Sequence, residues 1–222
     1  TQGWPTVSVI IPVYNEKMLA IRALEACCSL DYPRDRLQIV VADDSDDETV
    51  QLLDGFRGNT PVKIVRRQNR EGYKAGALQN ALSYTSAEFI SITDADHIPS
   101  KDFLKRTVSI LRGDDTLAFV QGRWVPESDG QSFLARSVGL ALDTHFRFDY
   151  DARAKSNTFP YLVGAGCVIR RTALEKVGGW TWDTLTEDLD LACRFGLAGL
   201  RGVFDGDAVS VTEYPQTLDV FR

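Results

Sequence analysis

The sequence has no surplus of basic residues and no long apolar run, and each absence excludes a class of protein. Its 25 lysines and arginines are outnumbered by 31 aspartates and glutamates, which gives a formal net charge of −6. This balance argues against non-specific binding of nucleic acid, because such binding needs a basic face. No uncharged apolar run reaches the roughly 18 residues that a transmembrane helix requires. We therefore expect no nucleic-acid partner and a chain that is soluble by itself.

Cysteine and histidine are too sparse to predict a zinc site. The four cysteines are Cys27, Cys28, Cys167 and Cys193. None of them forms a C-x-x-C pair, and adjacent cysteines do not readily bridge each other. We interpret them as reduced, buried, cytosolic thiols. His97 and His145 are the only histidines, which are fewer ligands than a metal-dependent phosphohydrolase usually has.

The first half of the chain alternates between two patterns. Apolar, β-branched runs predict buried strands at 6–13, 37–45, 62–67 and 88–93. Between them, helical patterns cover 16–30, 46–56 and 74–84. Strands that are apolar on both faces are typical of a parallel sheet. The order predicts an α/β fold with a Rossmann-like, mainly parallel central sheet and helices on both faces.

The second half is less regular. We expect a strand at 117–124, a helix at 131–154, an apolar run at 161–171, helices at 172–180 and 185–199, and a last strand or strand pair at 201–212. The helix at 131–154 carries Phe133, Phe146 and Phe148. These side chains suit either a membrane interface or ordinary packing against the sheet, and the sequence favours neither.

Acidic residues follow three of the predicted strands. Tyr14 and Glu16 come after the first strand, Asp43 and Asp44 end the second, and the fourth is followed by D-A-D-H at 94–97. Parallel sheets bind ligands at the carboxyl ends of their strands. Two carboxylates one residue apart repel each other unless a cation offsets their charge. The pattern therefore favours a divalent metal, with capping of the following helices as the alternative.

Six motifs occur in an order that matches a known family. They are VSVIIPVYNE, VVADDSDDET, NREGYKAGALQNAL, DADH, GAGCVIRR and TEDLDL. Together they resemble family 2 glycosyltransferases of the GT-A fold, and most of all the membrane-embedded, processive, cellulose-synthase-like β-glycan synthases. The resemblance implies one catalytic domain over 1–222, with a nucleotide-binding half at about 1–100 and an acceptor-binding half at about 101–222.

The resemblance also implies roles for the strand-end residues. The donor nucleotide would contact Tyr14, Glu16, Asp43, Asp44, Lys74 and Asp94. Asp94 and Asp96 would hold Mg²⁺ or Mn²⁺ against the donor diphosphate, with His97 as a metal neighbour or a simple turn residue. Lys74 opens a helix behind a glycine, where an ammonium and free N–H groups suit a phosphate. Arg70 is a weaker candidate for the same role.

TEDLDL supplies the catalytic residue that the resemblance implies. Asp188 would be the general base of an inverting transfer, which needs one carboxylate to take the proton of the acceptor hydroxyl. The alternative is that Glu187 and Asp188 only complement the macrodipole of the helix that they begin. The acceptor side would be bordered by Gly164, Gly166, Glu187 and Trp180. Trp180 suits either stacking on a sugar or burial in the core.

These residues lead us to expect an inverting, metal-dependent glycosyltransferase. It would move a sugar from a nucleoside diphosphate sugar, with UDP-glucose favoured, onto a growing β-linked polysaccharide. The alternatives are addition of a single sugar and a catalytically silent nucleotide-sugar-binding module. Processive members carry a downstream Q-x-x-R-W motif, which is absent before Arg222. We therefore expect a domain excised from a larger protein, whose flanking membrane helices hold it at the cytoplasmic face of the membrane.

Overall fold

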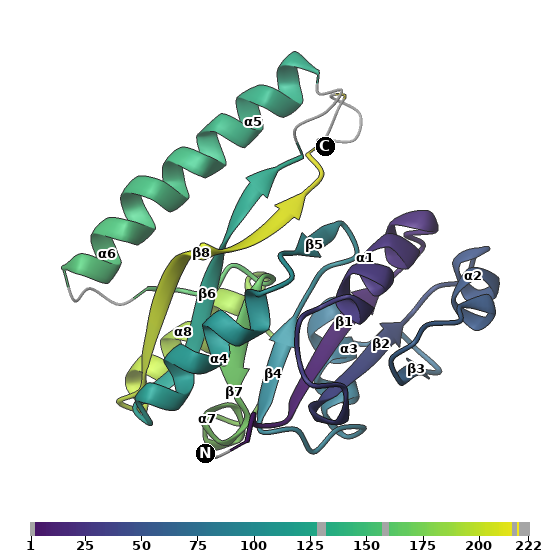
Figure 1. The fold of residues 1–222 in the computed structure, drawn as a ribbon, viewed down its shortest axis with the longest axis horizontal. Helices are drawn as coiled ribbons and strands as arrows, with labels where there is room; N and C mark the ends of the chain where they lie inside the picture. Colours follow the sequence, from purple (N-terminus) through teal and green to yellow (C-terminus); the bar gives the residue numbers. More distant parts are fainter. Residues whose placement is uncertain (1–2, 128–131, 157–159, 215–216, 218–222) are drawn as a thin grey trace.

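A single eight-stranded sheet forms the centre of the molecule (Figure 1). The computed structural model describes residues 3–127, 132–156, 160–214 and 217. The strands are β1 (Val7–Val13), β2 (Leu37–Asp43), β3 (Val62–Arg66), β4 (Phe89–Ile92), β5 (His97–Pro99), β6 (Leu117–Pro126), β7 (Cys167–Arg170) and β8 (Arg201–Thr212). Their order in the sheet is β3-β2-β1-β4-β7-β6-β8-β5.

Most neighbouring strands run parallel. β1 pairs in parallel with β2 and β4, β2 with β3, and β6 with β8. Only β7 and β5 run against their neighbours: β7 is antiparallel to β4 and β6, and β5 to β8. The predicted mainly parallel sheet is confirmed, and it is continuous from the first half of the chain to the second.

Helices cover both faces of this sheet, as the sequence predicted. They are α1 (Met18–Cys28), α2 (Thr49–Gly55), α3 (Tyr73–Leu82), α4 (Phe103–Gly113), α5 (Phe133–Thr144), a π-helical segment (His145–Tyr150), α6 (Asp151–Lys155), α7 (Arg171–Lys176) and α8 (Glu187–Leu197), with a 3₁₀ turn at Arg34–Arg36. Residues of α1, α2 and α4 form one core, and residues of α3, α7 and α8 form the other. On β1, Val9 belongs to the first core and Ile10 to the second.

The predicted helix at 131–154 is confirmed over its described residues. α5, the π-helical segment and α6 follow one another and extend away from the sheet, beside the ends of β6 and β8 (Figure 1). Phe146 is buried and stacks on Phe204 at 5.9 Å, whereas Phe133 and Phe148 are 88% and 71% exposed. One phenylalanine therefore packs in the fold and the other two face outward. Among the described residues, no helix has the length and apolar composition needed to span a membrane.

Two elements were not anticipated from the sequence. β5 and α4 occupy 97–113, to which we assigned no strand or helix. α4 buries Phe103, Leu104, Val108 and Leu111 on one face, which is the spacing of an amphipathic helix. β5 brings the chain back to the sheet after the D-A-D-H segment, and it pairs with the end of β8.

Candidate functional site

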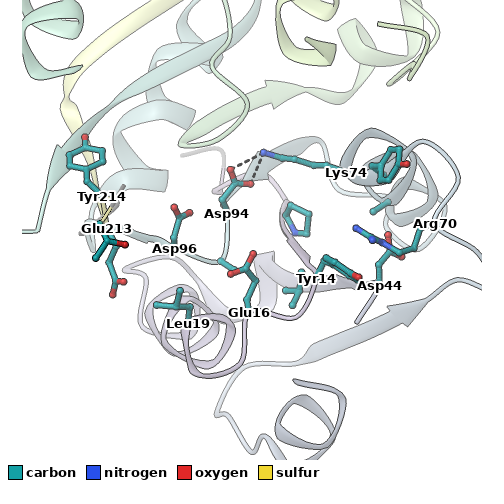
Figure 2. A pocket seen from close by; sticks show the side chains of 16 residues that line it. Tyr14, Glu16, Leu19, Asp44, Arg70, Lys74, Asp94, Asp96, Glu213 and Tyr214 are labelled. Atoms are coloured by element: carbon teal, nitrogen blue, oxygen red, sulfur yellow. Dashed lines mark hydrogen bonds and ion pairs between the residues drawn. The ribbon is translucent and has the colours of Figure 1, made fainter. Parts of the chain in front are cut away.

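A cavity of about 760 Å³ lies at the carboxyl ends of β1, β2 and β4 (Figure 2). Seven of the residues that the sequence singled out line it, namely Tyr14, Glu16, Asp44, Arg70, Lys74, Asp94 and Asp96. They come from the loops after β1, β2, β3 and β4 and from the start of α3. The expected convergence of strand-end side chains is therefore what the fold produces.

The loops around the cavity are held in uncommon backbone conformations. Among the described residues, only Asn15, Lys17 and Tyr73 combine a side chain with a positive φ, at 60°, 50° and 47°. Such conformations cost on the order of 1–3 kcal/mol each and occur mainly at functional sites. Asn15 and Lys17 flank Glu16, and Tyr73 precedes Lys74. The Asn15 N–H donates to Ser45 Oγ at 2.9 Å, which fixes the first loop.

Lys74 and Asp94 form an ion pair at the centre of the cavity. Lys74 Nζ lies 2.7 Å from Asp94 Oδ1 and 2.8 Å from Oδ2. Burial lowers the pKa of Lys74, but the Asp94 carboxylate opposes this, and the net pKa lies above its ordinary value. The pKa of Glu16 is raised by burial and by the charges of Asp96 and Asp94. Burial also raises the pKa of Asp96. One lysine thus faces three carboxylates.

The acidic cluster fits a divalent metal. Ligand atoms of Asp94, Asp96 and His97 lie within 4.8 Å of one another. Asp94 Oδ1 is buried, and Lys74 Nζ lies 2.7 Å from it. Burial lowers the pKa of His97, which favours the neutral imidazole that binds metals. The two carboxylates are suitable ligands for Mn²⁺ or Mg²⁺, which prefer oxygen, and the neutral imidazole lies beside them.

His97 is also a packing residue. Its ring meets that of Trp124 edge-on with centroids 4.6 Å apart, and only 2% of its side chain is exposed. Its Nε2 atom lies 3.7 Å from Asp96 Oδ1. The two interpretations of this residue, a metal neighbour and a turn residue, are therefore compatible.

The two aspartates at the end of β2 point to different surroundings. Asp44 lines the cavity and accepts from Arg67 Nε at 2.9 Å, with a second, close contact from the same guanidinium. The side chain of Asp43 is fully buried and does not line the cavity. It accepts from Arg66 Nε at 2.7 Å and from the Ser45 N–H at 3.0 Å. The structure thus brings only Asp44 to the site, and the expected donor contact of Asp43 has no support in this geometry.

The predicted base lies beside the cavity rather than in its lining. Asp188 is in the first turn of α8. A Cβ added to Gly164, whose φ is +79°, would lie 3.2 Å from Asp188 Oδ2 and 3.4 Å from Lys74 Nζ. Gly164 therefore separates the two charged groups, and it is small enough to let both approach. Glu187 is also near enough for its charge to raise the pKa of Lys74.

The other acceptor-side candidates are packing residues. A Cβ on Gly166, at φ +60°, would lie 3.0 Å from Trp124 Nε1, so the glycine makes room for that indole. Trp180 is 4% exposed in the core, and its backbone N–H donates to Gln79 Oε1 at 2.8 Å. Stacking of Trp180 on a sugar is therefore not available. Trp182, at 46% exposure, is the outward-facing tryptophan of this segment.

Several lining residues were missed or given too little weight. Tyr73 and Tyr214 line the cavity, as does Glu213, which follows β8 and forms an ion pair with Arg22 of α1. Tyr73 lies inside the NREGYKAG motif and was within reach of sequence analysis. Glu213 and Tyr214 reach the site only because β8 ends beside β5, which no local pattern reveals.

Comparison with known proteins places this site in a family. Residues 8–178 match the family model described as Glycosyl transferase family 2. The chain is 37% identical over 229 residues to the probable glucomannan 4-beta-mannosyltransferase 11 of Oryza sativa subsp. japonica, covering 99% of this chain and 40% of that protein. It is 35% identical over 231 residues to glucomannan 4-beta-mannosyltransferase 2 of Arabidopsis thaliana, covering 100% of this chain and 43% of that protein. The chain therefore spans less than half the length of these plant relatives.

Solved structures show the same fold. The mannosyltransferase PcManGT from Pyrobaculum calidifontis, in complex with GDP-Man and Mn²⁺, superposes with a TM-score of 0.78 at 29% identity, over 98% of this chain and 59% of that one. TarS 1-349 of S. aureus, in complex with UDP-GlcNAc, gives a TM-score of 0.71 at 17% identity, over 96% of this chain and 59% of that one, which shows the fold alone. The chain belongs to glycosyl transferase family 2 and has the GT-A fold.

Proposed function

We propose that this chain is the catalytic domain of an inverting mannosyltransferase that uses GDP-mannose to extend a β-linked glycan. One observation carries the proposal: Glu16, Asp44, Lys74 and the Asp94–Asp96 pair converge on one cavity in a family 2 chain. The names of the plant relatives and the GDP-Man complex of PcManGT favour mannose. They replace our initial preference for UDP-glucose.

The donor nucleotide fits the cavity in one direction. The end formed by Tyr14 and Asp44 offers an aromatic ring and a carboxylate, which suit a nucleobase and its N–H groups (Figure 2). Lys74, in the first turn of α3, offers an ammonium beside the free N–H groups of a helix start. These groups favour the diphosphate. The sugar then extends toward Gly164 and Asp188.

Asp94 and Asp96, with His97 beside them, would hold the divalent ion. When bound, that ion supplies positive charge to the departing diphosphate. Lys74 would also stabilise the negative charge of the diphosphate. Its ammonium lies within 2.8 Å of Asp94 and can pair with phosphate oxygens. The raised pKa keeps this lysine protonated at neutral pH.

Asp188 is our candidate for the general base. Inversion requires the acceptor hydroxyl to attack the anomeric carbon from the face opposite the diphosphate, while one carboxylate takes its proton. Asp188 and Lys74 both lie close to Gly164. Within the described structure the two side chains do not form an ion pair, although Lys74 is the proposed phosphate contact. Because Gly164 has no side chain, it does not hinder an acceptor sugar that approaches these two groups.

The acceptor and the setting complete the proposal. We propose that the acceptor is a growing glycan extended by repeated addition, and that the chain acts within a longer protein whose membrane helices hold it at the cytoplasmic face. Two observations support a longer parent: the plant relatives are more than twice as long, and Phe133 and Phe148 face outward on the projecting helix.

Binding calorimetry tests the donor and metal sites together. The chain is titrated with GDP-mannose and with UDP-glucose in Mn²⁺, and then in EDTA. We expect GDP-mannose to bind more tightly and EDTA to weaken its binding. Replacing Asp94 and Asp96 by asparagine should abolish the effect of Mn²⁺ without unfolding the domain. Failure of both nucleotides to bind in Mn²⁺ would refute the proposal, and binding that is indifferent to EDTA would refute the metal site.

A second measurement separates catalysis from mere binding. The protein extended to the length of its relatives is incubated with GDP-mannose and a β-linked mannan oligosaccharide. We expect longer oligosaccharides, whereas a silent binding module would leave the acceptor unchanged. Release of mannose without elongation of the acceptor would identify a hydrolase instead.

A further inference from the structure

Arg70 is a cation in the cavity that has no anionic partner among the described residues. Lys74, the other lining cation, is paired with Asp94. Within the described part of the chain, no carboxylate lies within ion-pair distance of Arg70, and its buried Nε has no hydrogen-bond partner. Instead, its guanidinium carbon lies 3.2 Å from the ring centroid of Tyr14 and 5.6 Å from that of Tyr73. The charge is thus held in place by aromatic rings.

A second arginine holds the loop that presents Arg70. Arg67 donates from one guanidinium to the carbonyls of Glu71 and Tyr73, at 2.7 and 3.0 Å, and to the carboxylate of Asp44. The Tyr73 N–H donates in turn to the Arg70 carbonyl at 2.9 Å. This network ties the loop to Asp44. Arg70 and Asp44 lie at the same end of the cavity (Figure 2), and the contacts of Arg67 fix the position of the Arg70 loop relative to Asp44.

Stacking on Tyr14 determines where Arg70 can donate. A guanidinium directs its N–H groups within its own plane, so contact with the ring does not block the edge formed by the two terminal Nη atoms, whereas Nε is buried. A nucleobase at this end would meet in-plane donors from Arg70 and the acceptor oxygens of Asp44. Guanine carries a matching pattern, because O6 and N7 form an adjacent pair of acceptors on one edge and N1–H with the 2-amino group forms a pair of donors on another. Uracil has no adjacent pair of acceptors.

We propose that Arg70 reads the guanine of the donor through paired hydrogen bonds to O6 and N7, and so sets the preference for GDP over UDP. This inference rests on the proposed function, since it assigns a specificity residue to the same donor site. Asp44, positioned by Arg67, accepts from the neighbouring edge of the base, which carries N1–H and the 2-amino group. Lys74 contacts only the diphosphate, which both nucleotides share.

Two variants of Arg70 separate base recognition from general attraction of phosphate. Arg70→Lys keeps the positive charge but loses the planar guanidinium with its paired N–H donors. Arg70→Met keeps a side chain of similar length but loses both the charge and the paired donors. We expect each to weaken GDP binding by about 10- to 100-fold, which is the discrimination that a bidentate arginine–guanine pair provides. Binding of UDP should change little. Arg57→Met, in the exposed loop after α2 and outside the cavity, is the matched control and should bind both nucleotides as the unmodified chain does.

A modified ligand tests the unmodified protein. 7-Deaza-GDP lacks the N7 acceptor but keeps O6, the diphosphate and the donor edge. In Mn²⁺ we expect it to bind the unmodified chain about tenfold more weakly than GDP, and to bind Arg70→Met as well as GDP does. This comparison does not depend on whether a variant folds.

The outcomes distinguish this inference from the proposed function. If Arg70→Met loses the same affinity for GDP as for UDP, and Arg70→Lys keeps its affinity for both, Arg70 is a phosphate contact. That result would overturn this inference but not the proposed function. Equal affinity of the unmodified chain for GDP and 7-deaza-GDP would do the same. A chain that prefers UDP, or binds neither nucleotide, would overturn the proposed donor as well.

Discussion

Replacing Gly164 by alanine tests whether Asp188 and Lys74 belong to one site. At φ +79° an alanine is in the left-handed region, which costs about 1–2 kcal/mol. In a chain of 222 residues this corresponds to a fall of about 2–8 °C in the melting temperature. The new Cβ would also lie 3.2 Å from Asp188 Oδ2 and 3.4 Å from Lys74 Nζ. The carboxylate must move by a few tenths of an ångström, because 3.2 Å is tighter than an ordinary contact.

Gly199 provides the matched control for this substitution. Its φ is +75°, and an added Cβ would have no neighbour within 4 Å. We expect Gly199→Ala to lose as much stability as Gly164→Ala, and to keep full transfer. Gly164→Ala should lower mannosyl transfer by about 10- to 100-fold, since small displacements of reacting groups have effects of that size.

Two assays measure these effects: urea unfolding of the chain, and transfer by the protein extended to the length of its relatives. Normal transfer by Gly164→Ala would show that the space around Gly164 is not used by the acceptor or the base. Equal losses of transfer in both alanine variants would show that backbone strain alone explains the result. Either outcome would refute the arrangement of base, glycine and lysine proposed above.

Two further predictions concern the carboxylates. Asp188→Asn should leave GDP-mannose affinity unchanged by calorimetry but lower transfer by about 10²–10⁴-fold, the usual contribution of a general base, and normal turnover would place the base elsewhere. Glu16→Gln should stabilise the chain against urea at pH 7 without metal or nucleotide, because a pKa raised in the folded state makes the ionised carboxylate unfavourable there. This gain should vanish as the pH falls to the ordinary glutamate pKa of 4.5, and a gain independent of pH would contradict the electrostatic cause.

Local patterns were sufficient to predict the fold of the first half of the chain. Parallel strands that are buried on both faces have long apolar runs, and their carboxyl ends lie on one edge. The positions of Glu16, Asp44 and Asp94 at the cavity follow from those two facts. The antiparallel direction of β7 could not be predicted, because a short strand buried on both faces has the same pattern in either direction.

Side-chain direction and distant pairing limited the prediction of the site. Asp43 and Asp44 are adjacent, but they have different partners. Asp43 pairs with Arg66 at the end of β3, and Asp44 pairs with Arg67, the next residue, and is the carboxylate that reaches the cavity. Trp180 is buried in a core that also contains Leu78 and Ala81, about a hundred residues earlier in the chain. Contacts of this kind are tertiary, and no local spacing contains them.

The left-handed residues around the cavity set a limit on how this enzyme can be made more heat-resistant. Asn15, Lys17 and Tyr73 keep their conformations only because the surrounding fold imposes them. Glycine at these positions would remove the conformational cost, but it would also let the loops that present Glu16 and Lys74 sample other arrangements. If the cavity binds the donor as proposed, selection for thermal tolerance and selection for donor binding act in opposite directions at these three positions. Stability must be gained elsewhere, for example among core residues that do not line the cavity, such as Leu24 and Phe195.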